Sequence, residues 1–256
     1  MKINLYGYGF VGKAHYETLK EHNEINIIDP IYPDLEQADF EPECCIVCVS
    51  TPQSDDGSCD MSSVIDVISK IDKTIPVLIK STISLEGWRH LKEHYSHYSI
   101  NFSPEFIRQD HYLEDFKNID TMYVSTEKAK FWATLFYPYW KDLTFVVAEA
   151  EELILVKYFR NSFRAVKVTF FNQVYDLCKS TNIDFNEVAA GICQDPIIGF
   201  SHSQVTEERG FGGHCLPKDS SALVKTAELF NCELPLINSA REYNSIIKNI
   251  SDHTKT

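Results

Sequence analysis

The first 29 residues carry the pattern that most constrains the fold of this chain. A short apolar strand at 2–6 leads into the loop Gly7-Tyr8-Gly9-Phe10-Val11-Gly12, which opens a helix running to about Lys20. A second strand, at 25–28, ends at Asp29. Strand, glycine loop, helix, strand and acid follow one another in the order typical of a dinucleotide site in a doubly wound parallel sheet.

The residues of this segment predict which dinucleotide binds. Gly7 permits the tight turn, Gly9 lets a pyrophosphate approach the helix N-terminus, and Gly12 lets helix and strand pack closely. Asp29 can accept hydrogen bonds from ribose hydroxyls, whereas a 2′-phosphate there would meet like charge. We therefore expect NAD as the cofactor. The expected cofactor contacts here are Gly7, Gly9, Phe10, Val11, Gly12 and Asp29.

Strand and helix patterns alternate through the rest of the first half of the chain. This alternation predicts an α/β fold, with a Rossmann-type domain over 1–148 built on a mostly parallel sheet. The further strands are expected at 43–50, 76–80, 99–102, 122–125 and 144–147, and helices at 64–71 and 88–95.

The pattern changes near Glu149. From there to about Ser180 no glycine or proline occurs, and apolar residues such as Leu153, Phe159 and Phe163 recur at helical spacing. This predicts one long connecting helix, followed by an all-helical central domain over 149–256. Such a helix is a natural hinge or dimer core.

The stretch Gly210-Phe211-Gly212-Gly213-His214-Cys215-Leu216-Pro217-Lys218-Asp219 places one cysteine between a glycine-rich loop and a helix read from Asp219 onwards. Pro217 suits the first turn of a helix. A helix N-terminus and the nearby Lys218 both favour a thiolate, which is the reactive form of cysteine. The stretch indicates a cysteine nucleophile in a substrate loop. The alternative is a buried cysteine after a turn, because the chain has eight cysteines.

Lys157 and Asn161 lie one turn apart on the predicted long helix. A lysine supplies charge and an amide supplies a directed donor, so the pair can bind an oxyanion. An ordinary polar pair on a solvated face is the alternative reading.

The net charge of −13 argues against nucleic acid as a partner. An anionic substrate would need a locally basic site, for which Lys157, Lys218 and Arg164 are candidates. No apolar run reaches the length of a membrane span, and no leader pattern precedes the first strand. We expect a cytoplasmic protein with reduced cysteines.

A metal site is not expected. Cys45 and Cys48 form a C-x-x-C pair, but strand geometry directs them to opposite faces, and no second pair of ligands follows at zinc spacing. The pair is interpreted as part of the core.

Taken together, these segments resemble the UDP-glucose/GDP-mannose 6-dehydrogenase family from Met1 to about Asn244. Several landmarks occur in the family's order, and the cysteine stretch is the most specific. They are the Gly7–Gly12 loop, Ser50-Thr51-Pro52, Lys80-Ser81-Thr82-Ile83, Phe102-Ser103-Pro104-Glu105-Phe106-Ile107-Arg108, Lys157-Tyr158-Phe159-Arg160-Asn161, Phe171-Asn172-Gln173 and Gly210–Asp219.

The resemblance implies a reaction. The family oxidises the C6 alcohol of a nucleotide sugar such as UDP-glucose to a carboxylate with two NAD. Cys215 matches the cysteine that forms a thiohemiacetal and then a thioester. Lys157 and Asn161 match groups that stabilise oxyanions. Asp219, Glu105 and Thr82 match groups that handle protons and position water.

The resemblance also implies binding residues and a homodimer formed through the central helical domain. Further cofactor contacts are Ser50, Thr51, Pro52, Thr82 and Lys218. The substrate contacts are Phe102, Glu105, Phe106, Ile107, Arg108, Lys157, Asn161, Phe211, Gly212 and Gly213.

Three departures from the family pattern affect these expectations. Gln109 stands where the family has a second acid, and the segment between Asp29 and Glu43 is shorter than usual. The sequence also ends before the family's further α/β domain, so nucleotide recognition is in question. A dehydrogenase of the 3-hydroxyacid type and a non-catalytic NAD-binding or scaffold protein are therefore kept as alternatives.

Overall fold

The computed structural model describes residues 1–140 and 142–253. The chain forms two compact units, which we describe separately. Unit 1 comprises Met1–Ser54 and Cys59–Lys157, and unit 2 comprises Asp55–Ser58 and Tyr158–Thr256. Positions 254–256 of the predicted second domain lie outside the described residues.

Unit 1 contains a five-stranded, wholly parallel sheet in the order β2-β1-β3-β4-β5, which confirms the predicted parallel sheet. β3 and β4 are buried along their whole length, which matches their uninterrupted apolar sequence. The strands are β1 (Lys2–Tyr6), β2 (Glu24–Ile28), β3 (Cys44–Val47), β4 (Val77–Ile79) and β5 (Ile100–Phe102).

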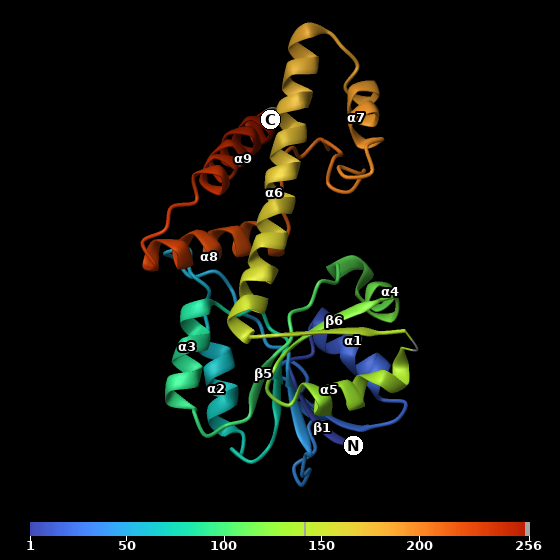
Figure 1. Ribbon diagram of the computed structural model, residues 1–256, viewed down its shortest axis with the longest axis vertical. Coiled ribbons are helices and arrows are strands. Elements are labelled where there is room, and N and C mark those ends of the chain that lie inside the picture. Colours follow the sequence, from blue (N-terminus) through green and yellow to red (C-terminus); the bar gives the residue numbers. More distant parts are fainter. Residues whose placement is uncertain (141, 254–256) are drawn as a thin grey trace. The chain divides into compact units, whose positions relative to one another are not determined.

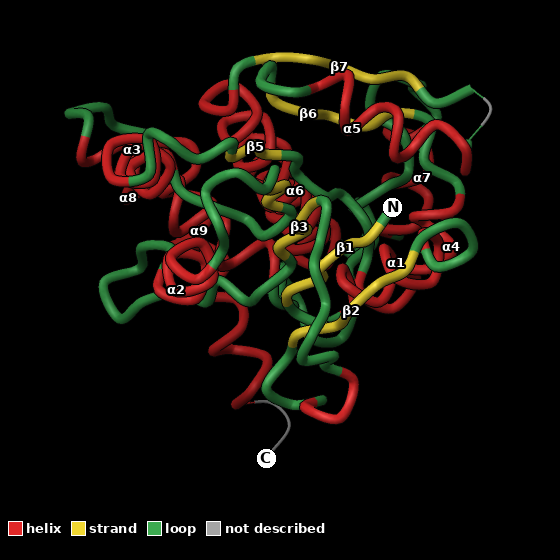
Figure 2. The backbone as a smooth tube through the Cα atoms, turned by 90° about the horizontal axis from the view of Figure 1, so that it is seen from below, coloured by secondary structure: helices red, strands yellow, loops and turns green. Residues whose placement is uncertain are grey.

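Helices cover both faces of this sheet. Figures 1 and 2 show α2 (Ser62–Lys70) and α3 (Leu85–His94) on one side, and α1 (Phe10–Leu19) and α4 (Tyr112–Lys117) on the other. The sequence patterns predicted α1, α2 and α3 but not α4. A further helix, α5 (Ala129–Phe136), packs its buried aromatic residues into the core beside α1. Short 3-10 turns lie at Pro33–Leu35, Gln109–His111 and Tyr137–Tyr139.

The last two strands form a separate parallel pair, β6 (Thr121–Ser125) and β7 (Thr144–Ala148). The sequence pattern had assigned them to the same alternating series as the other strands. Side chains take the place of backbone bonds where β5 meets β6. The Phe102 N–H donates to Ser125 Oγ (2.9 Å), and Ser103 Oγ donates to the Tyr123 carbonyl (2.6 Å). The main ladder therefore stops at β5.

Helices make up unit 2. The long helix α6 (Ala150–Thr181) confirms the predicted connecting helix, and its first residues belong to unit 1. The others are α7 (Phe185–Cys193), α8 (Cys215–Leu229) and α9 (Pro235–His253). Within unit 2, α7 and α9 lie on opposite sides of α6 (Figure 1). Of the helices in 1–140 and 142–253, none has a stretch apolar enough to cross a membrane.

Candidate active site

The predicted cofactor residues of unit 1 lie at one edge of the five-stranded sheet. Gly7 follows β1, Asp29 follows β2, Thr51 follows β3 and Thr82 follows β4. The carboxyl ends of parallel strands meet at the same edge, which is where ligands bind in open α/β sheets. Ser50 and Pro52, which flank Thr51, are exposed there.

Asp29 closes the glycine loop from the neighbouring strand. Its two carboxylate oxygens accept the backbone N–H groups of Tyr8 (2.6 Å) and Ile31 (2.8 Å). Each oxygen keeps further acceptor capacity for ribose hydroxyls. The side chain is half-buried, so a ligand can reach it.

The glycine loop fits a pyrophosphate. Gly9 caps α1 without any side-chain hydrogen bond, and a Cβ built on it meets no atom within 4 Å. Open space therefore faces the unsatisfied N–H groups of the first turn. Gly7 has φ +87°, and a Cβ on Gly12 would lie 2.0 Å from the Gly7 carbonyl oxygen, so both positions require glycine. The residues present therefore fit NAD.

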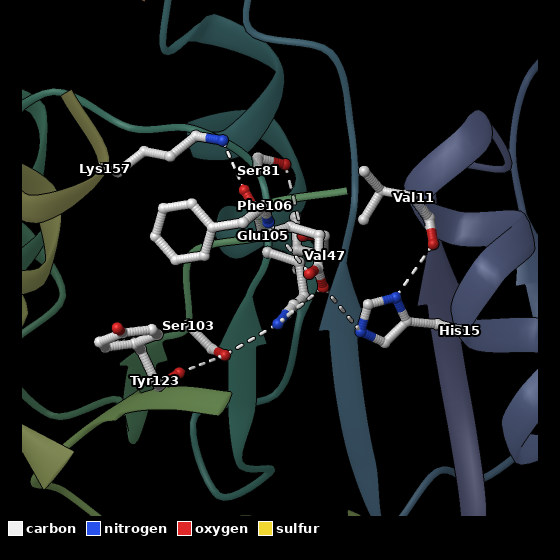
Figure 3. A network of polar contacts seen from close by, with 10 residues as sticks. Val11, His15, Val47, Ser81, Ser103, Glu105, Phe106, Tyr123 and Lys157 are labelled. Atoms are coloured by element: carbon white, nitrogen blue, oxygen red, sulfur yellow. Dashed lines mark hydrogen bonds and ion pairs between the residues drawn. The ribbon is translucent and has the colours of Figure 1, made fainter. Parts of the chain in front are cut away.

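Beyond β5 lies a buried charged cluster, drawn in Figure 3. Glu105 Oε2 lies 3.2 Å from Lys80 Nζ as an ion pair, and Lys80 also donates to Ser103 Oγ (2.8 Å). Glu105 Oε1 accepts the Phe106 N–H (3.1 Å). Burial opposes ionisation, but the charge of Lys80 and the Phe106 N–H together hold the pKa of Glu105 below its ordinary value. Glu105 is therefore a carboxylate at neutral pH.

His15 reaches the same carboxylate from α1. Its side chain is fully buried, and Nε2 lies 3.9 Å from Glu105 Oε2. Nδ1 lies 2.9 Å from the Val11 carbonyl oxygen, which can only accept. Burial, reinforced by the charge of Lys80, lowers the pKa of His15 to about 4. The ring is therefore neutral at pH 7.

Lys157 joins this cluster from the first part of α6. Its ammonium donates to the Glu105 carbonyl and lies 5.2 Å from the centre of the Phe106 ring. The side chain is buried, so the solvated-face alternative is excluded for this residue. A pocket of about 400 Å³ adjoins the cluster, and Lys80, Glu105 and Arg108 are among its lining residues.

In unit 2, Cys215 is the first residue of α8. The helix begins four residues before the position read from the sequence, and Pro217 lies in its first turn as expected. The preceding residue, His214, provides no side-chain cap. The thiol is half-buried, and no disulfide involves it. The alternative of a fully buried cysteine is therefore excluded.

Asp219 organises the surroundings of the cysteine in unit 2. It is 1% exposed, and both oxygens are hydrogen-bonded: Oδ2 accepts Asn161 Nδ2 (2.6 Å) and Oδ1 accepts Lys218 Nζ (2.7 Å). Arg164 donates to Asn161 Oδ1 at 3.3 Å. Asn161 is also buried, so this predicted pair is not an ordinary polar pair on a solvated face.

The glycine-rich loop before Cys215 is held by two side-chain amides. Asn244 Oδ1 accepts the Phe211 N–H (2.6 Å), and Asn172 Oδ1 accepts the Gly210 N–H (3.1 Å). Gly210 has φ +60°, and a Cβ on it would lie 2.2 Å from Asn244 Oδ1. The loop therefore has a fixed backbone in front of the cysteine.

Several predicted contact residues have other structural roles. Phe102 and Phe211 are buried in the cores of their units, and Arg108 is exposed in a two-contact pair with Asp115. Phe106, Ile107 and Thr82 are half-buried. Gly212 is exposed, and a Cβ there would approach only the flexible end of Lys248. Their assignments as contacts remain predictions.

Sequence reasoning gave no role to Lys80 or His15. Lys80 could have been suspected, because it directly follows an apolar buried strand, where an unpaired charge would be costly. His15 lies between Val11 and Leu19 on the face of α1 that packs inwards. A histidine on that face indicates a buried imidazole, but not its partner.

Two family models match most of the chain. Residues 31–139 match the NAD binding domain, and residues 149–246 the central domain, of the UDP-glucose/GDP-mannose dehydrogenase family. This chain belongs to that family. The match to the NAD binding domain confirms NAD as the cofactor.

Among curated relatives, a UDP-glucose 6-dehydrogenase of Bacillus subtilis is 30% identical over 250 residues, covering 91% of this chain and 52% of that protein. The UDP-glucose 6-dehydrogenase of Rickettsia typhi is 28% identical over 216 residues, covering 80% of this chain and 49% of its own length. The chain thus spans about half the length of the curated relatives it matches.

Solved structures confirm the fold. A UDP-glucose dehydrogenase from Pyrobaculum islandicum superposes with a TM-score of 0.80 at 22% identity, over 96% of this chain and 68% of that one. A GDP-mannose dehydrogenase from Pseudomonas aeruginosa, solved as a ternary complex, gives 0.67 at 23% identity with the same coverages.

Proposed function

We propose that this chain catalyses the NAD-dependent oxidation of a nucleotide-sugar C6 alcohol to a carboxylate, with UDP-glucose as the first substrate to test. The observation that supports this most is Cys215 at the uncapped start of α8, beside the bonded group Asn161, Asp219 and Lys218. A 3-hydroxyacid dehydrogenase has no need of such a cysteine. Combining Cys215 with Lys157 and Glu105 in one reaction rests on the family match.

Cys215 would capture the aldehyde formed in the first oxidation. The sulfur of its thiolate forms a bond to the aldehyde carbon, the carbonyl π bond opens, and the oxygen takes up a proton to give a thiohemiacetal. Covalent capture keeps the aldehyde from being released before the second oxidation.

Asn161 would stabilise the oxyanions. Its amide nitrogen carries two hydrogens, and Asp219 accepts one of them, which leaves the second for a substrate oxygen. Because Asp219 fixes the amide, the donor is already oriented before substrate binds. Lys157 would add positive charge at the same oxygen.

NAD, when bound, accepts one hydride in each of the two oxidations. Gly7, Gly9 and Gly12 would cradle its pyrophosphate, and Asp29 would hold a ribose. The second oxidation gives a thioester on Cys215, and water then attacks its carbon. Glu105, held as a carboxylate beside Lys80, would take the proton from this water, which releases the acid and the thiol. Gln109 cannot take over this role, because an amide does not accept a proton at neutral pH.

We also propose a homodimer formed through α6. Phe159, Phe163, Phe170 and Leu177 are between 45% and 69% exposed, and their spacing places them along one side of the helix. An apolar stripe of this size on a surface is typical of an interface. Light scattering should report two chains at micromolar concentration, and Phe163→Glu should give a monomer. A wild-type monomer would contradict the proposal.

The reaction is tested by the amount of NADH formed per UDP-glucose consumed, with Cys215→Ala and Cys232→Ala measured in parallel. Cys232 is exposed at the C-terminal side of α8, so it is a matched control for loss of a thiol. We expect two NADH per sugar in the wild type and in Cys232→Ala. In Cys215→Ala the second oxidation should not occur, so it should contribute no NADH. NAD binding without NADH formation would favour a non-catalytic protein.

A further inference from the structure

Two buried acceptor atoms face each other between α1 and the segment after β5. His15 Nε2 has no hydrogen-bond partner, and it lies 3.9 Å from Glu105 Oε2, the oxygen that Lys80 pairs with at 3.2 Å (Figure 3). Most buried polar side-chain atoms are hydrogen-bonded, so the unpartnered nitrogen calls for an explanation. A proton on Oε2 would supply the missing donor.

The tautomer of His15 is set by its other nitrogen. The Val11 carbonyl oxygen can only accept, so Nδ1 carries the ring proton in the neutral imidazole. Nε2 then presents a lone pair towards the carboxylate. A proton that arrives on Oε2 would find an acceptor already in place.

The ring has a fixed position. His15 packs against Phe116, with ring centroids 4.4 Å apart, and against Phe136 at 6.0 Å. The other titratable groups facing the pair are Lys80 and Cys48. Lys80 is the counter-charge of Glu105, and burial raises the pKa of the Cys48 thiol, which keeps it neutral. The Lys80 ammonium has no lone pair, and a neutral thiol is only a weak acceptor, so neither group competes strongly for a proton on Oε2 at neutral pH.

We propose that His15 is a positioning residue for Glu105: its Nε2 accepts a hydrogen bond from the proton that Glu105 gains when it acts as a base. This deepens the proposed function and rests on it for the role of Glu105. The water O–H bond breaks, the proton moves to Oε2, and the new O–H donates to Nε2. The proton later leaves by the reverse path to solvent, so the pair returns to its resting state.

Nitrogen-15 NMR of the histidine-labelled protein tests the geometry without any turnover. At pH 7 we expect His15 to be neutral, with its proton on Nδ1 and a bare Nε2. In Glu105→Gln, an amide N–H can donate to Nε2, so only the Nε2 resonance should shift. A wild-type ring protonated on Nε2 would overturn the proposal, whether or not the protein proves to be a dehydrogenase.

Kinetics test the role with three variants. His15→Phe keeps the ring packing but has no nitrogen, His15→Asn can still donate to Val11 but does not reach Glu105, and His15→Gln reaches it with an amide carbonyl. We expect kcat to fall about tenfold for Phe and Asn, the size of one lost hydrogen bond, with KM unchanged for both substrates. His15→Gln should recover most of the rate.

A pH profile separates positioning from structural support. Loss of the acceptor destabilises the protonated form of Glu105 and so lowers its pKa. The acidic limb of the pH profile of kcat should therefore move to lower pH in His15→Phe and His15→Asn. A fall in kcat that is equal in all three variants, without a shift of this limb, would overturn the proposal. An unchanged kcat in all three would do the same.

Discussion

Two buried carboxylates, one in each unit, stand beside a lysine and differ in what else their oxygens face. The two oxygens of Asp219 accept hydrogen bonds from Asn161 and Lys218. In Glu105, Oε2 is paired with Lys80 and also faces His15 Nε2, which has no hydrogen-bond partner. Asp219 is therefore placed to orient an amide, whereas Glu105 has an acceptor ready for a proton on Oε2.

The two lysines differ as well. The Lys80 side chain is 1% exposed, but that of Lys218 is 18% exposed. A buried charge that loses its partner cannot find water, whereas a half-buried one can turn outwards. The comparison therefore predicts different costs when each acid is replaced by its amide.

The largest effect is expected for Glu105→Gln, which leaves the Lys80 ammonium buried without a counter-charge. We expect a loss of about 3–5 kcal/mol in the free energy of unfolding, the usual cost of breaking a buried pair. Asp219→Asn should lower the free energy of unfolding by only about 1–2 kcal/mol, because Lys218 can reach solvent and the new side-chain carbonyl still accepts a hydrogen bond from Asn161. Urea unfolding measures both. The control is Asp115→Asn, in a surface pair with Arg108, for which we expect a loss of less than about 1 kcal/mol in the free energy of unfolding. Equal losses at Glu105 and Asp219 would remove the distinction between the two sites.

A smaller effect, about 3 kcal/mol in the free energy of unfolding, is expected when the pH is lowered. The pKa of His15 is lowered to about 4 in the folded protein, below its ordinary 6.5. The unfolded chain therefore takes up the proton first, and stability that is present above pH 6.5 is lost as the pH falls towards 4. Glu105, whose pKa is also lowered, adds to the loss at the acidic end.

His15→Phe should remove the part of this pH dependence that lies between pH 6.5 and 4.5. Urea unfolding of wild type and variant at several pH values across this range measures it. His202, whose pKa burial also lowers, remains in both proteins and provides the internal background. Parallel curves for the two proteins would show that His15 is not held neutral by the fold.

The smallest effect concerns the loop in front of Cys215. Gly210→Ala places a Cβ at positive φ against Asn244, so we expect a loss of about 1–3 kcal/mol and a displaced loop. Gly191→Ala, within α7 and open to solvent, is the control and should stabilise by about 0.5–1 kcal/mol. Equal effects at both positions would show that the loop is not fixed by Asn244.

The two sites also differ in how far the sequence predicts them. The glycine loop, Asp29 and the start of α8 follow from local patterns, because glycine, proline and strand-to-helix order act over a few residues. The sheet order then brings residues at the ends of β1 to β4 to one edge. Cys215 at a helix N-terminus was expected for the same local reason, although the helix starts earlier than predicted.

The partners within each site could not be predicted in this way. Glu105 and His15 are far apart in the sequence and meet only because α1 and β5 pack in one unit. Asn161 and Asp219 come from different helices, and the sequence around either residue does not predict its partner. The separate β6–β7 pair was missed because it depends on the side chains Ser103 and Ser125, which take over backbone bonds.

The most direct test of the account is mass spectrometry of Cys215 during a single turnover with UDP-glucose and NAD. We predict a sugar thioester on the peptide that contains Cys215, at higher occupancy in Glu105→Gln than in the wild type, because hydrolysis needs a base. Asp219→Asn should instead slow its formation. Full conversion to the acid with Cys215 unmodified in all three proteins, under rapid quenching, would contradict the cysteine mechanism.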